Sequence, residues 1–120
     1  MISFNFFSKY MSKPYTRKTV LLNAVTGTGA GDTMDIECVL SQFTCVVKWG
    51  GTTPTNTVVR LEGSIDGTVW GSLAEVTVTA TGTMFHIVNK PVQFIRGNYV
   101  SKSGGDATTA VTLDVVAGGN

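Results

Sequence analysis

The sequence has little of the chemistry on which most enzymes and nucleic-acid-binding domains depend. Of its 120 residues one is histidine, three are prolines and two are cysteines, and charged residues make up 14%, against about 25% in an average globular protein. Two cysteines are too few for a disulfide scaffold, and their spacing matches no zinc motif. We therefore expect Cys38 and Cys45 to be free thiols in a reducing compartment.

Long apolar runs are also lacking. A membrane-spanning helix needs about 18 or more apolar residues. A secretory signal needs a longer apolar segment than residues 2–7, followed by a small-residue cleavage site. The sequence contains neither pattern, so we expect no membrane partner and no export.

Charge is scarce and unevenly placed. Lys9, Lys13, Arg17 and Lys18 meet no acid within the first 18 residues, whereas the remaining chain carries five basic and eight acidic residues, a net charge of −3. A domain that binds nucleic acid normally gathers positive charge on its folded surface. We therefore expect no nucleic-acid partner.

The residues that are abundant favour β-structure. The chain contains 18 threonines, 16 valines and 14 glycines, a mixture typical of short strands joined by glycine turns. From Thr19 onward turn signals recur about every eight to twelve residues, the spacing of a sandwich or barrel. We predict an all-β protein, with an N-terminal extended arm in residues 1–18 and an antiparallel, jelly-roll-like β-sandwich of about eight strands in residues 19–120. The predicted strands are 19–25, 34–40, 43–49, 58–64, 74–80, 83–88, 92–101 and 110–117.

Period-2 alternation predicts which side chains share a face of each strand. The residues assigned to the core are Met34, Ile36, Cys38 and Leu40 in the second strand and Val111, Leu113 and Val115 in the last. If residues 41–42 form a two-residue turn, Cys38 lies opposite Cys45. Ser-Gln is poor chemistry for such a turn, so a crossing between sheets is the alternative.

The first 18 residues differ in kind from the rest. They combine aromatic and basic side chains without period-2 alternation, and Pro14 would end any short amphipathic helix there. One interpretation is an unstructured terminus, and the other is an arm that docks on a neighbouring subunit. In the second case the partner-binding residues are Phe4, Phe6, Phe7, Tyr10 and Tyr15.

Candidate catalytic residues are few. His86 is the only histidine, and it shares a strand face with Met84 and Val88. We interpret it as a strand residue in or near the core. No Gly-x-Ser-x-Gly motif accompanies it, so a Ser-His-Asp or Cys-His arrangement is not supported.

Metal and phosphate sites are equally weak in the sequence. Asp32, Asp35 and Glu37 could suggest calcium, which prefers clustered carboxylates. Asp35 and Glu37 nevertheless occupy the outward face of a predicted strand, as ordinary solvated residues do. The glycine loop 27–31 lacks the Gly-Lys-Ser/Thr ending of a P-loop and precedes a strand instead of a helix. We therefore expect no metal, no cofactor and no enzymatic activity.

Two segments carry a family resemblance. Residues 61–70 read Leu-Glu-Gly-Ser-Ile-Asp-Gly-Thr-Val-Trp, and residues 90–100 read Lys-Pro-Val-Gln-Phe-Ile-Arg-Gly-Asn-Tyr-Val. The pair resembles the discoidin-like, galactose-binding-like jelly rolls and is similar to small virion proteins of tailed bacteriophages. The similarity extends over about residues 57–117. Structural roles are expected for Asp66 and Gly67 in the hairpin turn, for Trp70 as filler of the sandwich end, and for Arg96 as a hydrogen-bond or ion-pair donor.

The resemblance implies a non-enzymatic virion structural protein, assembled in the host cytoplasm as a capsid decoration, minor capsid or tail-associated subunit. Its partners would be major capsid or tail subunits and further copies of itself. The alternative is a carbohydrate-binding or host-receptor-binding module in which Trp49 or Trp70 stacks on sugar rings. An enzyme is the third and weakest hypothesis.

Overall fold

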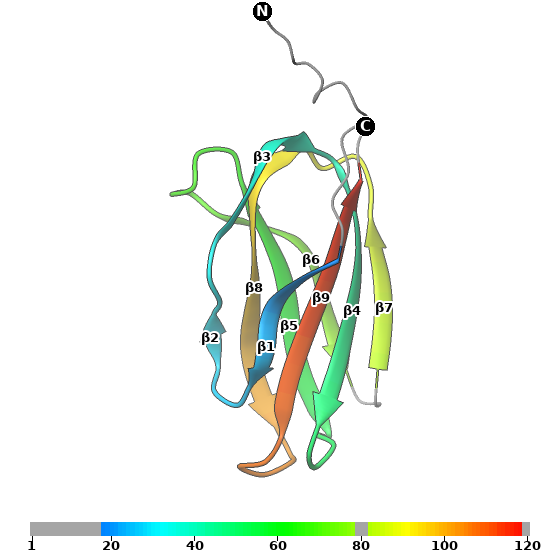
Figure 1. Cartoon of the computed structure of the whole chain (residues 1–120). Coiled ribbons are helices and arrows are strands. Elements are labelled where there is room, and N and C mark those ends of the chain that lie inside the picture. The colour runs from blue at the N-terminus through cyan, green and yellow to red at the C-terminus, as the bar shows by residue number, and fades with distance from the viewer. Residues whose placement is uncertain (1–17, 79–81, 119–120) are drawn as a thin grey trace, which may run out of the picture.

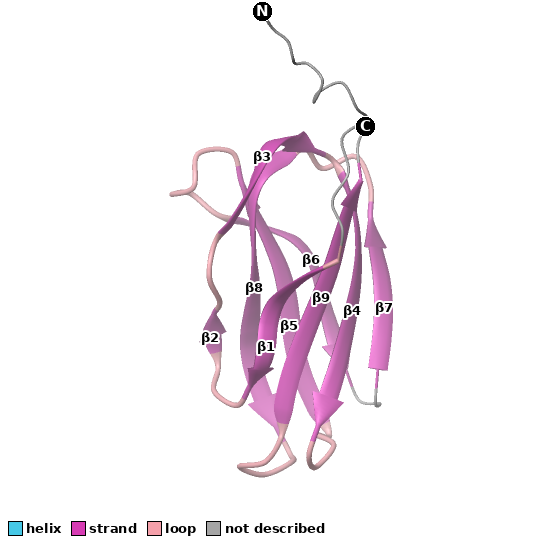
Figure 2. Cartoon of the chain, viewed as in Figure 1, coloured by secondary structure: helices cyan, strands magenta, loops and turns pink. Residues whose placement is uncertain are grey.

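The structure is a computed structural model that describes residues 18–78 and 82–118, and these consist of strands and loops (Figures 1 and 2). Sheet A contains, in spatial order, β1 (Thr19–Val25), β9 (Ala110–Gly118), β4 (Gln42–Gly50) and β7 (Gly82–Ile87). Sheet B contains β2 (Gly29–Ala30), β8 (Val92–Ser103), β5 (Asn56–Ser64) and β6 (Gly71–Val78), and β3 (Met34–Leu40) also pairs with β8. Every pair is antiparallel. The predicted all-β antiparallel sandwich is confirmed.

The eight predicted strands correspond to β1 and to β3 through β9, with ends shifted by at most a few residues. The additional strand β2 lies inside the segment that the sequence predicted as a loop. Among the described residues no helix is long and apolar enough to cross a membrane. The predicted arm residues Phe4, Phe6, Phe7, Tyr10 and Tyr15 lie outside the described residues.

The core lies between the two sheets, where alternate side chains of both layers interdigitate. Val111, Leu113 and Val115 are at most 1% exposed, as predicted for the last strand. Gly97 on β8 leaves room for core side chains of sheet A, because a Cβ there would lie 2.8 Å from Leu113 Cδ2 and 2.9 Å from Leu22 Cγ. The other hydrophobic core residues with no exposed surface are Cys45, Val47, Val59, Leu61, Ile95 and Tyr99.

Strand β3 departs from simple alternation. Glu37 has a φ of 66°, and the register with β8 shifts between Asp35 and Leu40. The irregularity turns Cys38 to the exposed side, so its assignment to the core face is wrong. Strands β3 and β4 belong to different sheets, which makes the crossing between sheets correct. The Cys45 thiol is buried and free, and burial raises its pKa to about 12.

Two loops are tied together at the end of the sandwich where β4 leads into β5 and β8 leads into β9. Thr52 donates its hydroxyl to Asp106 at 2.9 Å, and Thr109 donates its hydroxyl to the Thr52 carbonyl at 2.6 Å. Gly51, with a φ of +73°, packs directly against the backbone of Thr108, a position that only glycine fits. The two loops therefore link sheet A to sheet B at this end.

Candidate functional site

The outer face of sheet A carries exposed apolar side chains. Strand register places Val20, Asp114, Val46 and Met84 in one row across β1, β9, β4 and β7, which lie side by side in Figure 1. Met84 is 61% exposed and Val20 is 44% exposed. A neighbouring row begins with Val116, which is 42% exposed. We define the outer face of sheet A by these five residues.

Asp114 is the one acid in the described strands of sheet A, and its charge is neutralised. Its side chain is only 8% exposed, with Lys48 Nζ at 3.0 Å and Lys18 Nζ at 3.9 Å. The two lysine side chains are themselves 64% (Lys18) and 51% (Lys48) exposed. This face therefore carries aliphatic side chains around a covered acid that is paired with two lysines.

His86 lies on the same face, opposite Thr44, and its Nδ1 is 3.0 Å from the threonine hydroxyl. It is exposed, so the prediction that it lies in or near the core is wrong. The residues of β7 that turn inward are Phe85, which is half-buried, and Ile87, which is buried. Because β7 is apolar on both faces, alternation alone could not identify the inner one.

The outer face of sheet B has the opposite character, since it carries an ion-pair network. Glu62 on β5 accepts hydrogen bonds from Arg96 Nε at 2.7 Å, Asn98 Nδ2 at 2.9 Å and Arg60 Nη1 at 3.1 Å. Arg60 also donates to Glu75 on β6 at 2.7 Å. The charges of two arginines and two glutamates cancel, so this face is polar and its charged groups are paired with one another.

Glu62 is 5% exposed although it points away from the core. Burial alone would raise its pKa, but the hydrogen bonds from Asn98, Arg96 and Arg60 outweigh that effect and lower the pKa of the carboxyl. Glu62 therefore stays ionised at neutral pH and holds β5 and β8 together through charge-assisted hydrogen bonds.

The loop between β5 and β6 is held by Asp66. Its Oδ1 accepts the backbone N–H groups of Thr68 at 2.8 Å and Val69 at 2.9 Å, together with the Ser64 hydroxyl at 3.0 Å. These bonds lower the pKa of Asp66 to about 2. Gly67 adopts a φ of +83° in the turn. The fixed loop exposes the side chains of Ile65 and Val69, which are 76% and 75% exposed.

Trp70 follows this loop and lies outside the hydrophobic core. It is half-buried, with the Arg96 guanidinium carbon 4.3 Å from its ring centroid. The expectation that Trp70 fills the sandwich end therefore fails, and the arginine occupies one face of the ring instead. Trp49, by contrast, packs against the core from β4.

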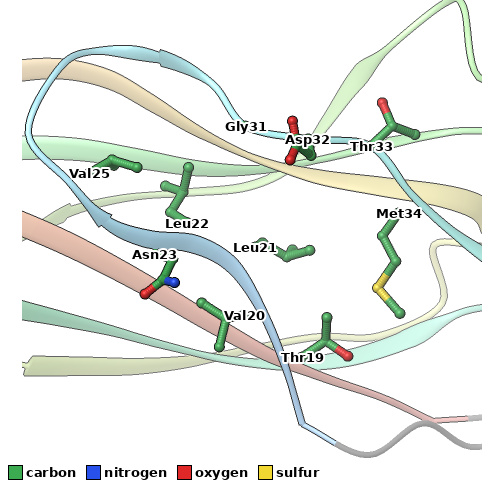
Figure 3. Close-up of a pocket in the computed structure, with 10 residues that line it drawn as sticks. All are labelled: Thr19, Val20, Leu21, Leu22, Asn23, Val25, Gly31, Asp32, Thr33 and Met34. Carbon is green, nitrogen blue, oxygen red and sulfur yellow. The ribbon is translucent and has the colours of Figure 1, made fainter.

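A shallow groove of about 460 Å³ runs between β1 and the segment that leads into β3. Figure 3 shows Asn23 of β1 on one side and Asp32, Thr33 and Met34 on the other. Within the described ranges no three histidine, cysteine, aspartate or glutamate side chains gather as a metal site. Asp35 accepts hydrogen bonds from Glu37 N–H and Gln93 and so serves the strand itself.

Sequence comparison finds no match: no protein-family model fits the chain, and no curated protein matches it. The fold does have solved relatives. The SPBc2 prophage-derived protein YomS superposes with a TM-score of 0.59 at 13% identity, over 86% of this chain and 91% of YomS. The PBSX exported protein XepA superposes with a TM-score of 0.61 at 15% identity, over 87% of this chain and 37% of XepA.

A carbohydrate-binding module, the CBM32 of AlyQ in complex with 4,5-unsaturated mannuronic acid, gives a TM-score of 0.55 at 12% identity. The alignment covers 83% of this chain and 75% of that module. Identities this low establish a shared fold and nothing finer. The sandwich is therefore one that occurs both in a prophage-derived protein and in a carbohydrate-binding module.

Sequence reasoning missed the outer face of sheet A. The signal was present in strands 83–88 and 110–117, where apolar residues such as Met84 and Val116 interrupt the expected polar positions. It also missed Glu62, although the motif around Asp66 contains it. An acid beside Arg60 on a strand looks solvated until pairing with β8 brings Arg96 over it.

Proposed function

We propose that this chain is a non-enzymatic structural protein of a bacteriophage particle, a capsid decoration, minor capsid or tail-associated subunit. It binds other virion proteins through the outer face of sheet A. The observation that carries the proposal is the contrast between the two sheets. Sheet A exposes Val20, Met84 and Val116, while sheet B covers itself with an arginine–glutamate network.

Exposed aliphatic side chains gathered on one face mark protein interaction sites. An interface needs a dry apolar centre with charge at its rim, and the neutralised Asp114 between Val20 and Val46 suits such a centre. The fold shared with the prophage-derived YomS gives the proposal its phage context. Binding only to the assembled lattice would stabilise the particle by mass action.

The N-terminal residues complete the proposal. The aromatic side chains Phe4, Phe6, Phe7, Tyr10 and Tyr15 would contact a neighbouring subunit and add a tethered second contact to the interface. A tethered second contact raises the effective concentration of the outer face of sheet A at its partner. Binding would therefore be tight even if the affinity of that face alone is modest.

The test is incorporation into particles. Particles are produced with the wild-type chain and with a Val20→Glu/Val116→Glu variant, purified by density gradient, and the chain is quantified by mass spectrometry. We expect the variant to be lost from particles, because two buried carboxylates would oppose the interface. A Ser72→Glu/Thr77→Glu variant changes exposed positions of β6 and serves as the matched control. Wild-type incorporation of the sheet A variant would show that this face is not the binding surface.

Carbohydrate binding is the second candidate function. The half-exposed ring of Trp70 and the fold shared with the AlyQ module favour it. Arg96 already covers one ring face, which leaves less surface for a sugar. A glycan-array signal that disappears in Trp70→Ala and persists in Val20→Glu/Val116→Glu would support this function over the first.

A further inference from the structure

Strands β1 and β7 are the two edges of sheet A as the structure describes it. In the described part of the chain β7 pairs with β4 and with no other strand. Figure 1 shows it at the rim of the sheet. Its six residues are Gly-Thr-Met-Phe-His-Ile. They include no proline, lysine, arginine, aspartate or glutamate. Natural edge strands usually carry a lysine, a proline or a bulge that prevents pairing with another chain.

The other edges of the sandwich carry such protection. Strand β1 has two register shifts and a positive φ at Ala24, and β3 has a shift and a positive φ at Glu37. Strand β6 carries Glu75 and a register shift opposite Leu61 and Glu62. Strand β7, by contrast, keeps uninterrupted register with β4 over all six residues. It is therefore a regular and unprotected edge.

We propose that two copies of this chain pair antiparallel through β7 about a two-fold axis at Phe85. This inference rests on the proposed function and deepens it, because it makes the first partner a second copy. In this register Phe85 of one copy lies opposite Phe85 of the other, and Met84 lies opposite His86. Thr83 lies opposite Ile87. A two-fold contact requires one surface to complement itself, and an uncharged antiparallel strand does so without like-charge repulsion.

The register centred on Phe85 makes the best use of the side chains. Phe85 is half-buried at the rim of the core, so an aromatic partner across the axis would cover its remaining surface. Met84, 61% exposed, would pack beside the imidazole of His86. Centring the pair on His86 would instead oppose two imidazoles, which repel each other when protonated.

Pairing would also change the proposed binding face. Sheet A would grow from four strands to eight, and the outer faces of the two copies would form one continuous surface. Val116, which is 42% exposed, and the half-buried Val46 keep their accessible surface in each copy, because they lie on β9 and β4 and not on the paired edge. The dimer would therefore present twice the surface to the virion partner.

The first test uses the unmodified purified chain. Analytical ultracentrifugation should show a concentration-dependent dimer, and hydrogen exchange should show slower exchange of residues 82–87 at high than at low protein concentration. Edge strands β1 and β6 serve as internal controls, because pairing through β7 leaves their exchange unchanged. A monomer at all concentrations, or protection on another edge, would overturn the proposal.

The second test uses complementary charges. Met84→Glu/His86→Glu places glutamates opposite each other twice across the axis, and the matching double lysine variant does the same with lysines. Each variant alone should remain monomeric, and an equimolar mixture should form the heterodimer. Both positions are exposed, and circular dichroism with thermal melting establishes that each variant is folded. A mixture that stays monomeric while each variant is folded would count against β7 pairing.

The two proposals fail in different experiments. The Val20→Glu/Val116→Glu variant should still dimerise, because neither residue is on β7. If that variant loses the dimer while the Met84/His86 variants keep it, the copies associate face to face and the edge pairing is wrong. A chain that dimerises through β7 but never enters particles would remove the proposed function and leave the dimer intact.

Discussion

Arg96 on β8 donates its Nε hydrogen to Oε1 of Glu62 on β5 at 2.7 Å, across the pair of strands at the centre of sheet B. The same guanidinium lies over the ring of Trp70, 4.3 Å from its centroid. One arginine thus joins the buried acid to the tryptophan that follows the β5–β6 loop. Replacing Glu62 and replacing Trp70 are therefore predicted to lower the free energy of unfolding by different amounts.

Replacing Glu62 by alanine should lower the free energy of unfolding by about 2 kcal/mol, because three charge-assisted hydrogen bonds are lost from a covered site. Glu75→Ala is the matched control, since its side chain is 46% exposed and should cost under about 1 kcal/mol. Urea unfolding at neutral pH measures both. An equal loss of unfolding free energy in the two variants would mean that the covered position of Glu62 adds nothing to stability.

Asp66 should make stability depend on pH in the acid range. Its folded pKa of about 2 lies below the ordinary 3.8, so the ionised form stabilises the loop above about pH 4, and this contribution is lost as the pH falls to about 2. Asp66→Asn should therefore be less stable than wild type at neutral pH. The difference in free energy of unfolding between the two proteins should shrink as the pH falls from about 4 to about 2. An NMR titration of the carboxyl checks the pKa directly, and a midpoint near 3.8 would contradict the prediction.

Trp70→Ala should destabilise the fold by only about 1 kcal/mol, because the change removes a cation–π contact and a half-exposed ring. Phe43→Ala should cost about 3–5 kcal/mol, since Phe43 is 2% exposed in the core. Thermal melting compares the two variants. A loss of similar size at both positions would place Trp70 among the core residues after all.

Deleting residues 1–15 should weaken incorporation into particles without lowering the melting temperature, because the sandwich and its core are built from residues 19–118 in the part of the chain that the structure describes. A second variant, with Phe4, Phe6 and Phe7 replaced by serine, tests the aromatic contribution while Lys9 and Lys13 stay in place. Quantitative mass spectrometry of purified particles measures the effect. Undiminished incorporation of both variants would rule out a binding role for this segment.

The sequence was most informative where one face of a strand is clearly apolar. In 110–117 the spacing of Val111, Leu113 and Val115 predicted the buried face correctly, because hydrophobic burial sets strand register. The Asp-Gly sequence at residues 66–67 likewise predicted the turn between β5 and β6. Such a turn needs only local features, a carboxylate that accepts nearby backbone N–H groups and a glycine with positive φ.

It was least informative where the answer depends on pairing between distant strands. The single irregularity near Glu37 turned Cys38 outward, and no local pattern announces such a bulge. His86 was assigned to the wrong side because β7 has apolar residues on both faces. Glu62 gained its role only when β8 brought Arg96 and Asn98 beside it.

The two thiols differ in a way that makes the protein easy to label. Cys45 is buried, with a pKa of about 12, and is therefore unreactive near neutral pH, whereas Cys38 is exposed on β3. A maleimide reagent should attach at one position only, on sheet B and away from the outer face of sheet A. An electron-dense tag at Cys38 would then reveal by microscopy where each copy sits in an intact particle, with the proposed contact surface left unmodified.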